Sequence, residues 1–206
     1  MQHRLQTLLG RLGIAAGAEA HQRLAHFVGL LQKWNRVYNL VGKSSSEEIL
    51  SLHLADSLSI HAHLVGQRIA DVGTGAGFPG LVLAVVDPAR HYTLIDSNSK
   101  KTRFLTQAVI ELGLDNVDIY SGRCQDLGHE RAFDSVTARA FAPLPEAVAL
   151  LRPLLAPGGR LLLMKARQAS QELEQLRGDY DKKIVRLEVP GLRAERNLVI
   201  LQPEQP

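Results

Sequence analysis

The sequence predicts an α/β protein whose parallel sheet is covered by helices on both faces. Short apolar segments alternate with helical segments from residue 66 onward. Those segments are mostly apolar, as strands buried on both faces are. A glycine-rich turn at residues 73–80 joins the first strand to the following helix. Sheets of this class bind their ligands at the carboxyl ends of the strands, so the turn marks the expected site.

A helical extension is expected over residues 1–65, ahead of the sheet domain at residues 66–206. Apolar residues recur at helical spacing in two stretches of the extension. Ser45 and Glu48 then have the spacing of a capping box, which predicts a third helix. These helices are expected over residues 5–12, 24–34 and 45–63.

Strands and helices then alternate through the sheet domain, with Gly113 as the expected stop of its second helix. The two last strands flank Pro190-Gly191 and are expected to pair antiparallel. The predicted strands are residues 68–72, 91–95, 117–120, 134–138, 161–164, 184–189 and 198–201. The predicted helices between them are residues 81–86, 104–112 and 144–155.

Composition narrows the class of protein. The chain has 206 residues, 45% of them hydrophobic and 22% charged, which is typical of a globular domain. A single cysteine excludes an internal disulfide framework and a multi-cysteine zinc site, and His61 and His63 lack partners at metal-ligand spacing. We therefore expect no metal. The sequence shows no signal peptide and no long apolar segment, so we expect a cytoplasmic protein that does not bind membranes. We also expect it to be a monomer.

The glycine-rich turn reads GTGAGFPG. Glycines allow a sharp bend and a close approach of the backbone to a ligand. The dinucleotide pattern G-x-G-x-x-G fits formally from Gly75 to Gly80, but Pro79 stands where the helix should open. A phosphate-binding P-loop is excluded, since no Gly-Lys-Ser/Thr follows.

Two acids beside the turn indicate the ligand. Asp71 precedes the turn, where a carboxylate would repel a pyrophosphate but suit an ammonium group. Asp96 ends the second strand, near the usual position of a ribose-binding acid. A nucleoside with a cationic tail satisfies both, and S-adenosylmethionine is such a ligand. The alternative is that the glycines only form a tight loop and both acids are solvated. We expect the amino-acid end to be held by Asp71, Gly73, Gly75 and Gly77, and the ribose by Asp96.

From about Lys33 to Leu201, the sequence resembles the RsmG family, also called GidB. The resemblance implies a Rossmann-like class I S-adenosylmethionine-dependent methyltransferase fold with an N-terminal helical extension. It also implies methylation of guanine N7 in 16S ribosomal RNA, as rRNA or in the small ribosomal subunit, and cofactor contacts at Gly73, Phe78, Cys124, Gln125 and Arg139. The matching segments are KWN (33–35), YNL (38–40), HLADS (53–57), DVGTGAGFPG (71–80), DS (96–97), KTRFL (101–105), RAFA (139–142) and ER (195–196).

The residues are compatible with methylation at N7 without a catalytic base or nucleophile. Methylation of a pyrimidine carbon needs a nucleophilic cysteine, and Cys124 stands where the adenine is expected. The Asn/Asp-Pro-Pro-aromatic loop of amine methyltransferases is absent after the fourth strand. Guanine N7 has a free lone pair and no proton at neutral pH, so alignment of donor and acceptor and exclusion of water can suffice. We therefore expect no catalytic residue in the strict sense, with Arg139 positioning cofactor and substrate.

Basic residues near the expected strand ends form a candidate RNA-binding rim, although scattered solvated charges are the alternative at a net charge of +3. A methyltransferase of another RNA position, of a protein or of a small molecule remains open, as does a nicotinamide-dependent oxidoreductase or plain nucleotide-binding module. The candidate RNA-binding residues are Lys100, Arg123, Lys165, Arg167 and Arg196.

Overall fold

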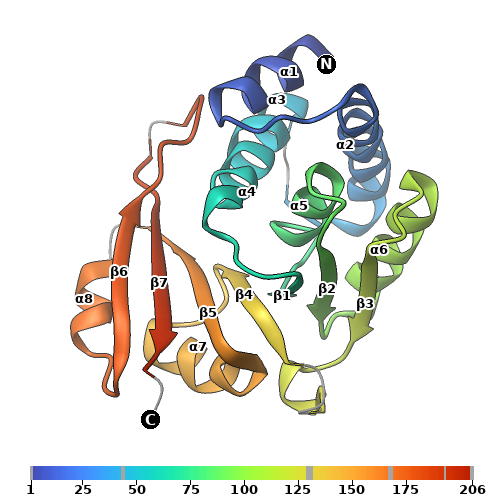
Figure 1. Cartoon of the computed structure of the whole chain (residues 1–206). Helices are drawn as coiled ribbons and strands as arrows, with labels where there is room; N and C mark the ends of the chain where they lie inside the picture. The colour runs from blue at the N-terminus through green and yellow to red at the C-terminus, as the bar shows by residue number, and fades with distance from the viewer. Residues whose placement is uncertain (1, 43–44, 129–131, 167–168, 193, 205–206) are drawn as a thin grey trace.

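The computed structural model describes residues 2–42, 45–128, 132–166, 169–192 and 194–204 (Figure 1). Its centre is a seven-stranded sheet in the order β3-β2-β1-β4-β5-β7-β6. β1 to β5 are parallel, and β7 runs antiparallel between β5 and β6. The strands are β1 (Arg68–Val72), β2 (His91–Asp96), β3 (Val117–Ser121), β4 (Phe133–Arg139), β5 (Leu155–Lys165), β6 (Tyr180–Arg186) and β7 (Asn197–Pro203).

Helices cover both faces of the sheet, as predicted. Ile69 and Leu94 belong to the core beneath α1, α2, α5 and α6, whereas the alternate strand positions Val72 and Val136 belong to the core beneath α7 and α8. Figure 1 shows α7 and α8 beside β5 and β6, away from α2 and α6. The helices are α1 (Gln2–Arg11), α2 (Ala18–Tyr38), α3 (Ser46–Glu48), α4 (Asp56–Leu58), α5 (Gly80–Val86), α6 (Ser99–Leu112), α7 (Leu144–Leu151) and α8 (Ala169–Glu174).

The third helical stretch differs from the single α-helix predicted. Its capping box is confirmed, because the Ser45 backbone N–H donates to Glu48 Oε2 at 2.7 Å and the Glu48 N–H donates to Ser45 Oγ at 3.2 Å. After α3, however, Ile49–Ala55 form a π-helix, and the α-helical pattern returns only at α4. Such wider turns are rare and often occur at functional sites. Hydrophobic spacing alone does not distinguish them from an α-helix.

The predicted strands are all present, with differences at their ends. β5 begins at Leu155, six residues before the predicted start, and Pro157-Gly158-Gly159 lie inside it at an irregularity of the β4–β5 pairing.

Residues of the helical extension, such as Leu24 and Phe27, cover the face of the sheet that contains Ile69, and they share one core with the strands. α8 was not predicted. Among the described residues, no helix is long and apolar enough to cross a membrane.

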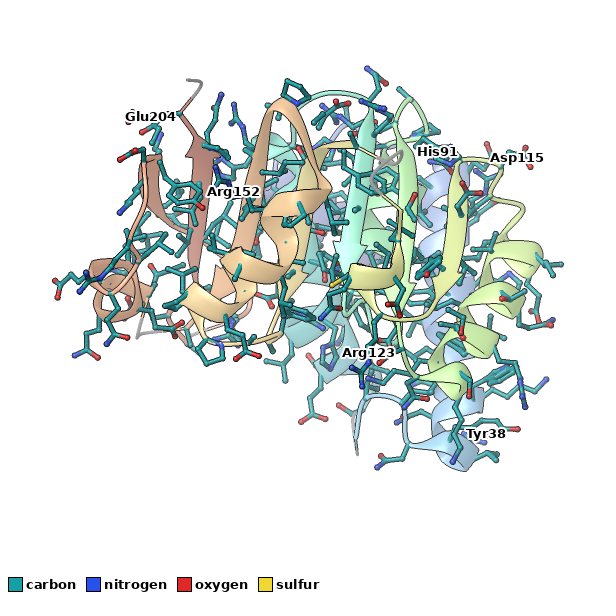
Figure 2. All side chains as sticks on the ribbon, turned by 90° about the horizontal axis from the view of Figure 1, so that it is seen from below. Tyr38, His91, Asp115, Arg123, Arg152 and Glu204 are labelled. Atoms are coloured by element: carbon teal, nitrogen blue, oxygen red, sulfur yellow. The ribbon has the colours of Figure 1, made fainter. Side chains whose placement is uncertain are left out.

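The strand order places the expected site where the chain changes direction. β1 lies between β2 and β4, so the connections after β1 and β4 leave the sheet in opposite directions. A crevice forms at this point, outside the carboxyl ends of the strands. Figure 2 shows Arg123, which follows β3, at the same end of the molecule as Tyr38, and His91 and Asp115 at the opposite end. We call the end with Arg123 the carboxyl edge.

Candidate functional site

The glycine-rich turn is held against β2 and against the segment that follows β4. The Gly73 backbone N–H donates to Ile95 O at 2.8 Å, which fixes the turn at the end of β1. Gly73 has φ of +70°, and a Cβ there would lie 2.9 Å from Cδ2 of Phe141. Only glycine therefore combines this backbone conformation with such close packing of an aromatic ring. The turn ends in α5, which begins at Gly80.

Asp71 lies behind the turn and not at its mouth. Its side chain is buried, and its two oxygens accept hydrogen bonds from Gly80 N at 2.7 Å and from Thr137 Oγ1 at 3.0 Å. Burial raises the pKa of Asp71 to about 6, although its hydrogen bonds oppose the shift. We expected Asp71 to contact the ammonium group of a ligand, but its buried and hydrogen-bonded carboxylate does not favour that contact. Asp71 instead shapes the turn, because it ties the end of β1 to the start of α5.

Asp96 also braces the turn, from the end of β2. Its Oδ2 accepts from Gly75 N at 2.9 Å and its Oδ1 accepts from Asn98 N at 2.8 Å. Unlike Asp71, Asp96 borders the cavity described next. Its position at a strand end beside this cavity is the one that the sequence predicted for a ribose-binding acid.

A cavity of about 210 Å³ opens between the ends of β1, β2, β3 and β4. This is below the roughly 300–1,000 Å³ of common ligand pockets, so the cavity accounts for only part of a cofactor. The cavity brings together five predicted residues and does not include Asp71, Gly75, Gly77, Phe78 or Arg139 in its lining. The lining is Val72, Gly73, Ile95, Asp96, Ser97, Gly122, Arg123, Cys124, Gln125 and Phe141.

Cys124 is suited to a binding role and not to nucleophilic catalysis. It is buried, and burial raises the pKa of its thiol. The thiol donates a hydrogen bond to Gln125 Oε1 at 3.3 Å, so the protonated form is the one the site holds. Because the nucleophile is a thiolate, a raised pKa opposes attack on a pyrimidine ring.

Arg139, at the end of β4, contacts the helical extension. Its Nη1 lies 3.2 Å from Asp56 Oδ2, and its Nη2 donates to Nδ1 of His53 at 3.3 Å. The guanidinium also lies over the ring of Phe78, 5.2 Å from the ring centre, and His53 stacks on the same ring at 5.0 Å. Burial, followed by the Arg139 charge, lowers the pKa of His53 to about 4, so His53 is neutral at neutral pH.

Asp56 pairs with a second arginine as well. Nε of Arg196 lies 3.3 Å from Asp56 Oδ1, so one buried carboxylate contacts guanidiniums from two different parts of the sheet. Burial raises the pKa of Asp56, and Arg139 and Arg196 oppose that shift. Among the described contacts, His53 and Asp56 meet through Arg139 and share no hydrogen bond of their own.

The candidate RNA-binding residues occupy different environments. Lys100 and Arg123 are exposed at the carboxyl edge. Lys165, in contrast, is enclosed: its ammonium donates to Ala142 O at 2.6 Å and to Glu172 Oε2 at 2.8 Å. Arg196 is partly covered beside Asp56, and Arg167 lies outside the described residues. The rim therefore consists of free and paired cations, not of one uniform set.

Several of these contacts could not be found by sequence reasoning. Thr137 and Glu172 carry no motif, and they contribute only because strands and helices distant in sequence meet here. Gly122 lines the cavity, and its position directly after the third strand is a feature by which the sequence could have indicated this. Within the described residues, no group of three or more potential metal ligands is found.

The comparisons with known proteins define the family. The family model GidB, described as rRNA small subunit methyltransferase G, matches residues 20–199. The chain belongs to the GidB family. This membership confirms the predicted class of activity, a small-subunit rRNA methyltransferase that uses S-adenosylmethionine.

Relatives of this GidB chain match nearly its whole length. Ribosomal RNA small subunit methyltransferase G of Methylococcus capsulatus is 47% identical over 199 residues, which cover 97% of each chain. The protein of the same name from Laribacter hongkongensis is 45% identical over 202 residues, covering 98% of each chain.

Solved structures confirm the fold. A SAM-dependent methyltransferase from Aquifex aeolicus superposes with a TM-score of 0.58 at 17% identity, covering 76% of this chain and 93% of that chain. A predicted O-methyltransferase from Agrobacterium tumefaciens superposes with a TM-score of 0.60 at 18% identity, covering 74% of this chain and 81% of that one. The Rossmann-like methyltransferase fold that the sequence predicted is therefore present.

Proposed function

We propose that this GidB-family protein transfers a methyl group from S-adenosylmethionine to N7 of a guanine in 16S ribosomal RNA. The observation that carries the proposal is the glycine-rich turn, which is braced from behind by Asp71 and from the side by Asp96. It lies against a cavity bordered by Asp96 and Cys124 at the switch point of the sheet. Family membership supplies the rRNA of the small subunit as the substrate class.

The residues present fit the cofactor. The backbone at Gly73 and Gly75 has positive φ, is partly exposed and would provide a bare main-chain surface for the amino-acid end. Gly77 also has positive φ but is buried against Leu81, so in this proposal it shapes the turn from within. Asp96 would accept from ribose hydroxyls, and Cys124 and Gln125 would border the adenine. Bound there, the cofactor supplies an electrophilic methyl group on a sulfonium. Phe78 and Asp71 are buried, so in this proposal they support the turn from within.

The chain's own contribution to the reaction is placement. Guanine N7 needs no proton removed, and positioning of two reactants can lower a barrier by roughly 7–11 kcal/mol in favourable cases. The described side chains around the cavity are consistent with that requirement. Cys124 keeps its proton, and neutral His53 is occupied by Arg139. Arg139 would orient the guanine and cofactor, because its guanidinium lies on Phe78 beside the turn.

The RNA would approach the carboxyl edge. Lys100 and Arg123 are exposed there and would contact phosphates, while Arg196 would do so from the β7 side. In keeping with this substrate, we propose that the protein acts as a monomer in the cytoplasm, without a metal.

Transfer of labelled methyl groups tests the proposal. Small subunits from wild-type cells and from cells lacking this protein are incubated with the purified enzyme and tritiated S-adenosylmethionine. Nucleosides are then separated after digestion. Label in 7-methylguanosine, found only with subunits from the deficient cells, is the expected result. Label in another nucleoside, or none, would contradict it.

A further inference from the structure

We propose that Asp56 is a positioning residue for rRNA methylation. It holds Arg139 and Arg196 side by side at the carboxyl edge, where the pair binds a phosphate group of the RNA next to the target guanine. This inference rests on the proposed function and adds a residue outside the cofactor site. It also gives the helical extension a part in recognising the substrate.

Three separate segments meet at this carboxylate. Asp56 begins α4, directly after the π-helix, whereas Arg139 ends β4 and Arg196 directly precedes β7. The Arg139 Nη1 lies 3.2 Å from one carboxylate oxygen and the Arg196 Nε lies 3.3 Å from the other. Two guanidiniums this close would repel each other without the negative charge between them. Asp56 therefore keeps the two guanidiniums beside each other, Arg139 through a hydrogen bond and Arg196 through an ion pair.

The charges are not balanced within the cluster. Asp56 neutralises one of the two arginines, and His53, the fourth polar member, is neutral at neutral pH. The Asp56 side chain is only 5% exposed, but those of Arg139 and Arg196 are 20% and 27% exposed. Positive charge thus remains accessible to solvent while the carboxylate does not. An incoming phosphate would meet cations and not the acid that holds them.

Stability alone does not explain this arrangement. A buried ion pair seldom stabilises a fold more than apolar residues of the same volume would, because both charges lose their hydration. A device that binds a phosphate needs fixed guanidiniums, because their planar donors match phosphate oxygens in pairs. Binding of the substrate phosphate would then offset the hydration that these charged side chains lose on burial.

The molecule contains a matched control for this cluster. Asp87 is also a buried carboxylate, and it pairs with Arg90 and His61. It follows α5 and precedes β2, which starts at His91 at the end of the molecule opposite Arg123 (Figure 2). Asp87→Asn therefore repeats the chemical change at a place that the RNA is not expected to reach.

The experiment compares Asp56→Asn with Asp87→Asn in methylation of small subunits. Asp56→Asn is expected to lower kcat/KM by about tenfold to a hundredfold, the effect of a slight misplacement of reacting groups. Affinity for S-adenosylhomocysteine should fall less than kcat/KM does, because Asp56 acts on the cofactor only through Arg139. Affinity for an unrelated RNA should stay the same or increase, since a negative charge is removed. Asp87→Asn should leave kcat/KM within about twofold at a comparable loss of thermal stability.

The outcomes separate this inference from the proposed function. An active wild type with an equally active Asp56→Asn, or with the same loss in Asp87→Asn, would overturn the inference alone. A wild type that transfers no methyl group to 16S rRNA would overturn the proposed function, and this inference with it.

A second variant covers the case in which Asp56→Asn does not fold. Arg196→Gln changes a partly exposed side chain, so folding should persist. It should lower kcat/KM and reduce the slope of log affinity against log salt by about 0.7–0.9, the effect of one lost phosphate contact. The control Arg152→Gln changes an exposed arginine just before β5. Equal salt slopes for Arg196→Gln and wild type would overturn the inference.

Discussion

The ring of Phe141 packs against the backbone of Gly73, so closely that a Cβ at position 73 would lie 2.9 Å from its Cδ2 atom. Both residues line the cavity at the carboxyl edge. The connection after β4 thus covers the turn after β1, and the two loops on either side of the switch point fix each other. The width of the candidate cofactor site depends on this contact.

Gly73→Ala should damage the site through this contact. The substitution imposes a side chain at φ of +70° and pushes against Phe141, so stability should fall by about 1–3 kcal/mol. Affinity for S-adenosylhomocysteine, measured by calorimetry, should fall by about tenfold or more, because the displaced ring and the new methyl group occupy the site.

Gly29→Ala is the control for this change. Gly29 lies within α2, and a Cβ there would have no neighbour within 4 Å. The same substitution should therefore raise stability by about 0.5–1 kcal/mol and leave cofactor affinity unchanged. Equal effects of the two substitutions on affinity would contradict the role given to the Gly73–Phe141 contact.

Asp71→Asn should change how stability depends on pH. Burial raises the pKa of Asp71 to about 6 in the folded protein, against 3.8 as its ordinary value. The folded state therefore holds the proton more tightly, and this stabilisation is present below about pH 4 and lost as pH rises to about 6. Asparagine can keep one acceptor for Gly80 N without a charge. Relative to wild type, the variant should gain roughly 1–3 kcal/mol between about pH 4 and pH 7.

Urea unfolding of both proteins at several pH values measures this difference. A constant difference in the free energy of unfolding across that range would show that Asp71 is not the group responsible. Cofactor affinity offers a second measurement. If Asp71 supports the turn only through its hydrogen bonds, affinity should change little in Asp71→Asn.

His53→Gln should shift the pH dependence in the opposite direction. The pKa of His53 falls to about 4 in the folded protein, from 6.5, because burial and Arg139 disfavour its charged form. The unfolded chain therefore takes up a proton between about pH 6.5 and 4 that the folded chain does not, and stability is lost as pH falls. The variant should lose less stability than wild type on acidification from about pH 7 to pH 4.5, measured by the urea midpoint. An equal or larger loss would contradict this assignment.

The sequence was sufficient for the sheet and for the turn after β1. Four of the five parallel strands are five to seven residues long and mostly apolar, and Gly113 ends α6 in the left-handed conformation, as its position predicted. Local patterns carry such information because burial on both faces and helix termination act within a few residues. The π-helix over Ile49–Ala55 was not predictable in this way. Its residues have ordinary helical spacing, which does not distinguish a π-helix from an α-helix.

At the site, too, the sequence predicted the features that depend on nearby residues and not those that depend on residues distant in the chain. Gly73 and Asp96 line the cavity at the ends of β1 and β2, the end of the sheet at which the sequence predicted the site. The orientation of Asp71 was not predictable, since its burial depends on Thr137 in a strand 66 residues away. Lys165 illustrates the same limit. Its basic side chain at a strand end suggested RNA, but Glu172 of α8, an element not predicted, encloses its ammonium.

Lys165→Gln and Arg123→Gln should therefore affect different properties. Lys165 is partly buried against Glu172 and Ala142, so its replacement should lower stability by about 1–3 kcal/mol, because the Glu172 carboxylate loses its partner. It should leave the salt dependence of RNA binding unchanged. Arg123 is exposed beside the cavity, so Arg123→Gln should preserve stability but reduce the slope of log affinity against log salt by about 0.7–0.9. Thermal unfolding and RNA binding at several salt concentrations measure both. A reduced salt slope in Lys165→Gln would instead place its ammonium at the RNA, which requires the ion pair with Glu172 to open on binding.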